Sequence, residues 1–262
     1  MATAKDRQSL AVWEEFHKSL LRGVEVDNSL TRQDIERQRA QLERDPIEWI
    51  KFFFPAYAKY EFAPFHIRAI RRVIANDEWY EVLSWSRELA KSTVAMFVIM
   101  FLTLTRRKRF VALASATIDS AKRLLLPFKI NFESNPRIRQ FYGEQTTIGQ
   151  WTDSEFSCRC GAKFIALGAG SAPRGMRNEA IRPDILYFDD YDTDEDCRNP
   201  VTLDKKWDWA EHALYPTRSI SEPTLVLWCG NIIAKDCCIT RAGHLANSWD
   251  IVNIRDDAGR ST

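Results

Sequence analysis

The spacing of apolar and polar residues divides the chain into two parts. The first 45 residues are mostly polar and rich in helix-forming side chains, and Ser29 or Thr31 is placed to cap a helix. A proline suits the first turn of the next helix, and the aromatic-rich segment 46–54 is expected to pack against the main body. The pattern predicts a helical arm or subdomain over residues 1–45 and a main domain over residues 46–255.

Beyond about residue 60, short apolar runs alternate with longer helical patterns. The predicted strands cover residues 80–85, 110–115, 185–188, 224–229 and 249–254, with a hairpin over 156–167. The predicted helices cover residues 63–75, 91–105, 118–133 and 202–215. Strands that alternate with helices predict an α/β fold with a mostly parallel central sheet flanked by helices. Since ligands bind at the carboxyl ends of such strands, the loops that follow them are the expected places for chemistry.

Composition narrows the classes of function. The 262 residues are 45% hydrophobic, which is enough for a substantial core. The formal net charge is only +1, whereas proteins that merely coat nucleic acid are far more basic; a motor that grips DNA transiently remains allowed. Six irregularly spaced cysteines favour reduced thiols in a cytoplasm over a secreted disulfide framework. The longest apolar run, residues 94–104, is too short to span a bilayer, so no membrane partner is expected.

A degenerate phosphate-binding loop follows the first predicted strand and opens a helix. The usual motif is G-x-x-x-x-G-K-[ST], and here Trp85 and Ala90 stand at its glycine positions. Lys91 is placed to reach the β- and γ-phosphates, Ser92 to ligate Mg²⁺, and Arg87 to touch the γ-phosphate. The residues expected to contact ATP here are Ser86, Arg87, Glu88, Leu89, Ala90, Lys91, Ser92 and Thr93. Alone, the segment is equally explained as a helix start with solvated cations.

Two adjacent carboxylates at the end of a buried strand favour the phosphate-binding interpretation over the plain helix start. Four apolar residues, too few for a helix, lead into Asp189 and Asp190. P-loop enzymes hold Mg²⁺ with an aspartate at such a strand end, the Walker B arrangement. Asp189 is predicted to hold the metal, directly or through water, and Asp190 to orient or deprotonate the attacking water. Glu195 is the reserve catalytic carboxylate, while residues 192–196 otherwise read as an acidic cap on the following helix. Together the two motifs predict a P-loop NTPase that uses ATP and Mg²⁺.

Several segments, in this order, resemble the N-terminal ATPase domain of the tailed-bacteriophage terminase large subunit. They are residues 85–93, 110–125, 131–136, 170–175 and 225–236, and the resemblance covers residues 50–255. It implies a P-loop NTPase fold of the ASCE or RecA-like kind. It also implies a motor that hydrolyses ATP to drive double-stranded DNA into a capsid in the host cell cytoplasm. The partners it implies are the portal protein, the small terminase subunit and further copies in a homo-oligomeric ring, although the isolated domain can be monomeric.

The resemblance also implies roles for individual positions. Gly230 and Asn231 correspond to the coupling turn, whose usual threonine-containing sequence is replaced here. Arg174 corresponds to a loop arginine, the arginine finger, that reaches a neighbouring subunit's ATP, with Arg177 as its rival. Phe65 and His66 stand where the family contacts adenine; for Phe65, core packing is an equally good explanation.

The remaining expectations concern the missing nuclease domain, the alternative functions and two segments with a second interpretation. Residues 256–262 look like a linker toward a C-terminal nuclease domain that this chain lacks, so ATP hydrolysis without DNA cleavage is expected. The alternatives are a helicase-like or other nucleic-acid-remodelling P-loop ATPase and a catalytically inactive P-loop scaffold, which the two lost glycines suggest. A zinc site at Cys158 and Cys160, and DNA contacts by the basic run 106–109, are the minority interpretations of those segments.

Overall fold

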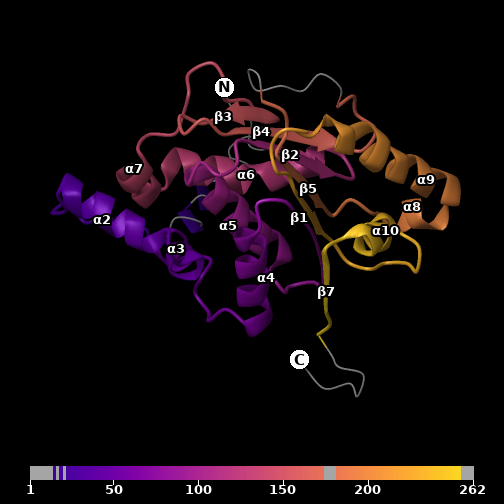
Figure 1. Ribbon diagram of the computed structural model, residues 1–262, viewed down its shortest axis with the longest axis horizontal. Coiled ribbons are helices and arrows are strands. Elements are labelled where there is room, and N and C mark those ends of the chain that lie inside the picture. Colours follow the sequence, from indigo (N-terminus) through magenta and orange to yellow (C-terminus); the bar gives the residue numbers. More distant parts are fainter. Residues whose placement is uncertain (1–13, 16–17, 20–21, 174–180, 255–262) are drawn as a thin grey trace.

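A seven-stranded sheet forms the centre of the computed structural model, which describes residues 14–15, 18–19, 22–173 and 181–254 (Figure 1). The strands are β1 (Trp79–Trp85), β2 (Phe110–Ser115), β3 (Glu155–Ser157), β4 (Lys163–Gly168), β5 (Ile185–Asp189), β6 (Leu225–Cys229) and β7 (Ser248–Val252). Their order in the sheet is β3-β4-β2-β5-β6-β1-β7. Every neighbouring pair is parallel except β3 and β4, which form the predicted hairpin. The predicted α/β fold with a mostly parallel sheet is confirmed.

The predicted helices are present, and three short helices were not predicted. The helices are α2 (Arg32–Leu42), α3 (Pro46–Phe53), α4 (Pro64–Ala75), α5 (Lys91–Leu104), α6 (Ile118–Ser134), α7 (Pro136–Tyr142), α8 (Asp194–Arg198), α9 (Pro200–Asp208) and α10 (Cys238–Leu245). The sequence pattern did not reveal α7, α8 and α10, which have five to eight residues and too few turns to show a period. The helix predicted over 202–215 is α9 followed by a π-helical turn, Trp209–Leu214.

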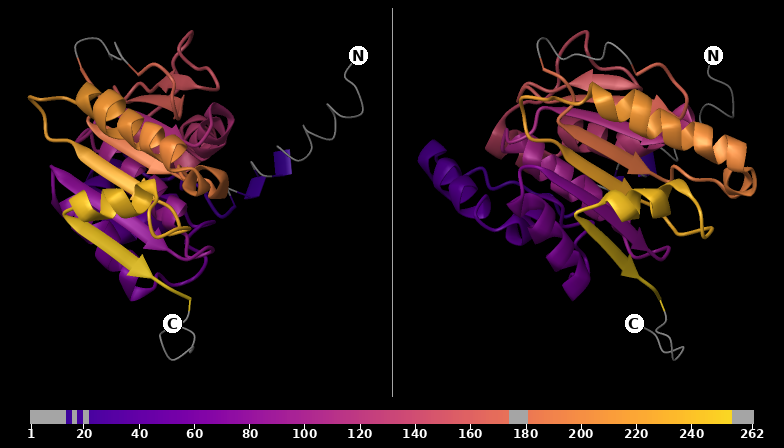
Figure 2. Two further views of the ribbon diagram at one scale, coloured as in Figure 1. Left: turned by 90° about the vertical axis from the view of Figure 1, so that its right-hand side faces the viewer. Right: turned by 45° about the vertical axis from the view of Figure 1, so that its right-hand side comes forward.

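Two apolar cores lie on opposite faces of the sheet, because successive side chains of a strand point to opposite sides. In β5, Ile185 and Tyr187 face the core formed with α3 to α7, while Leu186 and Phe188 face the core formed with α9 and α10. The views in Figures 1 and 2 show α4 and α5 on one side of the sheet and α9 and α10 on the other. Asp189 continues the first face, toward α5, and this places its carboxylate beside the start of that helix.

The segment before residue 54 is anchored by side-chain contacts. Thr31, one of the two predicted caps, forms a capping box with Asp34 at the start of α2. Trp49 of α3 is fully buried and donates from Nε1 to the hydroxyl of Tyr142 at 2.8 Å, and that hydroxyl donates to Glu43 at 2.9 Å. The aromatic segment therefore packs against the main body as expected. The division at residue 45 stays a prediction.

The described part of the chain contains no helix that combines the length and the apolar character needed to cross a membrane. Helix α5, which contains the longest apolar run, has 14 residues and is buried along almost its whole length.

Candidate active site

The carboxyl ends of β1, β5 and β6 meet around a cavity of about 450 Å³. It is lined by Arg87, Glu88, Lys91, Asp190, Tyr191, Asp192, Thr193, Asp194, Trp228, Cys229, Gly230, Asn231, Ile233 and Ile239. Both predicted motifs contribute, and so does the coupling turn after β6. The fold therefore brings together segments that lie about 100 and 140 residues apart, at the edge of the sheet where ligands are expected.

The loop between β1 and α5 has the backbone of a phosphate loop without its glycines. Glu88 and Ala90 adopt positive φ angles of 69° and 58°, a region that favours glycine. For Ala90 this left-handed conformation costs roughly 1–2 kcal/mol. Among the described residues no side chain caps the N-terminus of α5, so its first backbone N–H groups are left for an anionic ligand. Strain of this kind is typical of functional loops.

Lys91, the first residue of α5, is almost completely buried, with 8% of its surface exposed. Its ammonium group donates to Asn231 Oδ1 at 3.1 Å. A buried ammonium held by one neutral amide retains two donors for an anion in the cavity. The contact joins the phosphate loop to the predicted coupling turn.

Asp189 ends β5 and is completely buried below the cavity. The hydroxyl of Tyr187 donates to its Oδ2, whereas Oδ1 has no hydrogen-bond partner among the described residues. Burial raises the pKa of Asp189 to about 7, an effect that hydrogen bonds from Tyr187 and Ser92 oppose. A buried carboxylate oxygen without a partner is costly unless a cation or a proton satisfies it.

These donors fit a Mg²⁺ site that a nucleotide would complete. Asp189 supplies the unpartnered oxygen, and Ser92 lies close enough to shift the pKa of Asp189. In the described residues no three His, Cys, Asp or Glu side chains cluster as a metal site of their own. Because Mg²⁺ prefers six oxygen ligands and keeps several waters, phosphate oxygens and water would have to supply the rest.

Asp190 lines the cavity, whereas the preceding Asp189 is buried. The φ angle of Asp190 is 43°, and its N–H donates to the carbonyl of Cys229 at 3.2 Å. The side chain is exposed and lines the cavity, whereas Glu195 is not among the lining residues. The geometry favours Asp190 over Glu195 as the group that can meet a water molecule in the cavity.

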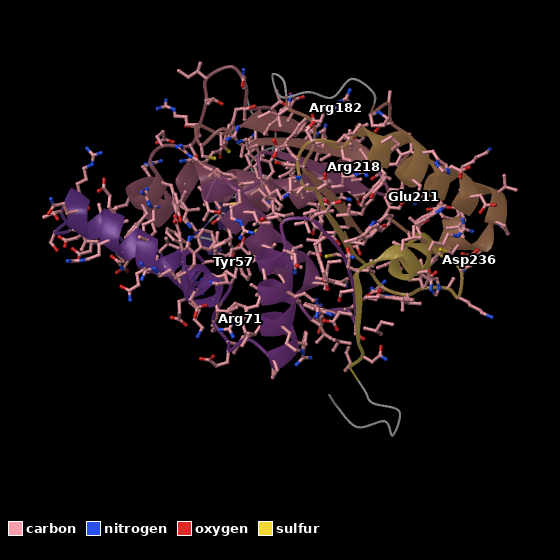
Figure 3. The ribbon with its side chains drawn as sticks, in the orientation of Figure 1. Tyr57, Arg71, Arg182, Glu211, Arg218 and Asp236 are labelled. Carbon is pink, nitrogen blue, oxygen red and sulfur yellow. The ribbon has the colours of Figure 1, made fainter. Side chains whose placement is uncertain are left out.

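The turn after β6 is held at both ends. Asn231 binds Lys91 at its start, and Asp192 caps α10 at its end by accepting from the N–H groups of Cys238 and Ile239, both at 2.9 Å. Asp236, labelled beside α10 in Figure 3, pairs with Arg241 at 2.7 Å. Sequence reasoning missed the role of Asp192, because 46 residues separate the cap from its helix. Thr193, in contrast, caps the adjacent α8, and the acidic residues 194–196 form the first turn of that helix.

His66 packs against the phosphate loop rather than facing the cavity. Its Nδ1 accepts from the N–H of Ala63 at 3.2 Å, and its Nε2 lies 3.0 Å from the carbonyl oxygen of Leu89. The ring also contacts Phe65 and the buried Trp85, with centroids 4.1 and 5.4 Å away. Both ring nitrogens are therefore engaged by backbone, and a base could meet His66 only through a ring face.

The other residues considered in the sequence either lie outside the described part of the chain or have a structural role. Arg174 and Arg177 lie outside the described residues, as does the proposed linker at 256–262. In the basic run, Arg107 pairs with Asp77 at 2.7 Å and Lys108 is buried, donating to backbone carbonyls. These two cations stabilise the fold. Sequence reasoning did not single out Trp207 and Trp209 for function, and the structure packs both: Trp209 is buried, and Trp207 lies near Trp228.

Known structures resemble this arrangement. The HK97 bacteriophage large terminase matches 81% of this chain with a TM-score of 0.54 and 12% sequence identity. This chain has the fold of a phage large terminase. It spans 44% of the length of that protein. The P-loop fold predicted from the sequence is thereby confirmed.

Two further structures are similar at lower scores. The ATPase domain of the Thermus phage P74-26 large terminase matches 69% of this chain and 68% of its own length, with 17% identity and a TM-score of 0.42. The Phi-28 gp11 DNA packaging motor matches 71% of this chain and 59% of its own length, with 12% identity and a TM-score of 0.40. No protein-family model and no curated protein matches the sequence.

Proposed function

We propose that this chain is the ATPase domain of a viral terminase large subunit, which hydrolyses ATP to drive double-stranded DNA into a capsid. The observation that carries the proposal is that Lys91, Asp190 and Asn231 line one cavity next to a helix N-terminus, with the buried Asp189 adjacent to Asp190. This combination offers an anion site, an unsatisfied carboxylate for a cation and an exposed carboxylate for a water molecule. The terminase fold supports the packaging role.

In this proposal the phosphate loop binds the triphosphate. The first N–H groups of α5 and the ammonium of Lys91 neutralise the β- and γ-phosphates, and Arg87 at the cavity edge meets the γ-phosphate. Ser92 and Asp189 would hold Mg²⁺, directly or through water. The metal would supply charge neutralisation on the phosphate oxygens as the terminal bond breaks.

Asp190 is the proposed catalytic carboxylate. Its exposed position allows it to orient the attacking water or to accept its proton. Arg174 remains the candidate to act on a neighbouring subunit's ATP, which would make the site complete only in a homo-oligomeric ring. The portal protein, the small terminase subunit and double-stranded DNA are the further partners that the terminase resemblance suggests.

Asn231 is proposed to report the state of the nucleotide. When a γ-phosphate competes for the Lys91 ammonium, the contact between Lys91 and Asn231 changes, and the turn after β6 can respond. Because Asp192 ties the far end of this turn to the Walker B segment, the movement is transmitted to α10.

The test is steady-state phosphate release by the wild-type chain, Lys91→Ala and Asp190→Asn, with DNA and at protein concentrations high enough for subunits to meet. Hydrolysis by the wild type should fall at least 100-fold in both variants, roughly the effect of losing one electrostatic or general-base group. Equal inactivity of all three proteins would instead favour an inactive scaffold. Hydrolysis with helicase activity, and without packaging by the full terminase, would favour a remodelling ATPase.

A further inference from the structure

A separate cavity of about 320 Å³ lies between the end of α5 and the turn that joins β3 to β4, at one edge of the sheet (Figure 1). Its residues precede β2 and β4, so it opens at the amino ends of these strands, away from the carboxyl ends where the candidate active site lies. The lining consists of Arg106, Arg109, Thr147, Gln150, Ser157, Cys158, Cys160, Gly161 and Ile181. Two thiols thus share one cavity with two guanidinium groups.

The sulfur of Cys160 accepts several hydrogen bonds in this turn. The thiol of Cys158 donates to it, and so does the backbone N–H of Ala162. The bond from Cys158 is the main reason that the pKa of Cys160 falls from 9.0 to about 7; burial opposes the shift, and the charge of Arg106 adds to it. Arg159, between the two cysteines, donates instead to a backbone carbonyl of the loop before β3. At neutral pH a large share of Cys160 is therefore thiolate, the nucleophilic form.

The other thiols lack this combination of access and ionisation. Cys158 is buried, and burial raises its pKa, so it remains the neutral donor. Cys197 is half-buried like Cys160, but burial raises its pKa to about 12. The remaining cysteines are all buried: Cys229, Cys237 and Cys238.

The guanidinium groups of Arg106 and Arg109 are exposed and available to an anion. Arg107, between them in sequence, pairs with Asp77 at 2.7 Å, whereas Arg106 and Arg109 form no ion pair with another described residue. Asp184 accepts from the backbone N–H of Arg109 at 2.8 Å, but it does not line the cavity. With two cations and no carboxylate in the lining that the structure describes, the cavity favours a ligand of negative charge.

A zinc site, the other use of a C-x-C pair, does not fit this cavity. A structural zinc ion takes four ligands, and among the described residues no third His, Cys, Asp or Glu groups with the two sulfurs. The two arginines would also repel a metal ion.

We propose that Cys160 is a modification site for small anionic disulfides, with Arg106 and Arg109 binding the carboxylates of the reagent. The Cys160 thiolate attacks one sulfur of the disulfide, and a new S–S bond forms as the old one breaks. One half stays on Cys160 as a mixed disulfide, and the other leaves as a thiolate that takes a proton from water. The protein sulfur is oxidised and the departing half is reduced. Cys158 acts as a positioning residue, because it donates to the thiolate without reacting.

The test measures the rate of modification by glutathione disulfide, which is anionic, and by hydroxyethyl disulfide, which is neutral, between pH 6 and 9. Each rate is divided by that of a small free thiol, and peptide mass spectrometry locates the adduct. We expect one fast addition, at Cys160, half-maximal near pH 7 and favouring the anionic reagent. Cys160→Ser should abolish it, whereas Cys197→Ser, the matched control, should leave the rate unchanged.

Further variants separate the roles of the neighbours. The double variant Arg106→Gln with Arg109→Gln should lower the preference for the anionic reagent about tenfold, roughly the effect of two partly exposed ion pairs. Cys158→Ala should move the half-maximal rate to higher pH, and Cys158→Ser, which keeps an O–H donor, should restore it.

Two results would overturn the proposal. Equal normalised rates with the two reagents would exclude the anion site, and modification of another cysteine as fast as Cys160 would exclude the thiolate assignment. Both results come from the wild-type protein, so a folding defect in a variant does not remove the test. Neither depends on ATP binding, so the outcome is independent of the proposed function.

Discussion

The imidazole of His66 holds the backbone of Leu89 in the phosphate loop, with Nε2 3.0 Å from the carbonyl oxygen. Since Nδ1 accepts from the N–H of Ala63, the proton of the neutral ring lies on Nε2, which donates to Leu89. The C=O and N–H groups of one trans peptide point in opposite directions. The contact therefore turns the N–H of Ala90 away from α4, toward the open side of the loop.

We expect His66→Ala to weaken binding of MgADP about fivefold, the effect of losing one hydrogen bond that orients the loop. His66→Gln, which keeps a donor, should retain most of the affinity. Binding at pH 7.5 measured by calorimetry checks both. Wild-type affinity in the alanine variant would show that the loop holds its conformation without this contact.

The same contact predicts a dependence on pH. Burial lowers the pKa of His66 from its usual value of 6.5, because the charged ring is poorly solvated. The folded state thus binds fewer protons than the unfolded state, and stability is lost as pH falls from about 6.5 toward the lower folded-state pKa. Urea unfolding of the wild type between pH 5 and 7.5 should show this loss, and His66→Gln should reduce it. Identical pH profiles would exclude His66 as the group that titrates.

Asp189 is expected to lower the stability of the free domain at neutral pH. Its folded-state pKa of about 7 lies above the ordinary value of 3.8, so stability falls as pH rises from about 4 to 7. In EDTA at pH 8, Asp189→Asn should be more stable than the wild type by about 4 kcal/mol, and about equally stable at pH 4. Urea unfolding at both values measures this, with the exposed Asp190→Asn as control. The variant should also lose ATP hydrolysis.

Ala90 occupies a position that favours glycine, with φ of 58°. We expect Ala90→Gly to raise the free energy of unfolding by about 0.5–1 kcal/mol, because relief of the left-handed strain exceeds the added entropy of the unfolded chain. Ala90→Val should lower it by more than 1 kcal/mol, since a β-branched residue is strained there. Denaturant unfolding measures both. A stabilising valine would mean that the loop adopts another backbone conformation.

Asp192 stabilises α10 from a distance in sequence. Removing its carboxylate in Asp192→Ala leaves the N–H groups of Cys238 and Ile239 without acceptors, and should cost about 1–2 kcal/mol. Asp192→Asn should cost less, because the amide oxygen can still accept one bond. Urea unfolding measures the loss, and hydrogen exchange should locate it in α10. Protection of α10 that is unchanged in the alanine variant would contradict this role.

The strands and long helices could be predicted because their determinants are local. Phe110–Ser115 is an apolar run of strand length, and the structure has β2 at those residues. The apolar stretch that begins at Lys91 is long enough to require a helix, and α5 ends one residue before the predicted end. Helix α10 was not predicted, because its eight residues and its cap on Asp192 leave no sufficient local signal.

The sequence alone determined which residues could carry chemistry: a lysine and a serine at a helix start, and two aspartates at the end of an apolar strand. The tertiary structure decided which of them meet. The sheet order sets β6 between β1 and β5, and this places Asn231 on Lys91 across 140 residues. The packing of the elements also buries Asp189 with one oxygen unsatisfied, and it places His66 against the phosphate loop. Local patterns specify the element that a residue belongs to, whereas contacts between elements depend on strand order and packing, which no short stretch of sequence encodes.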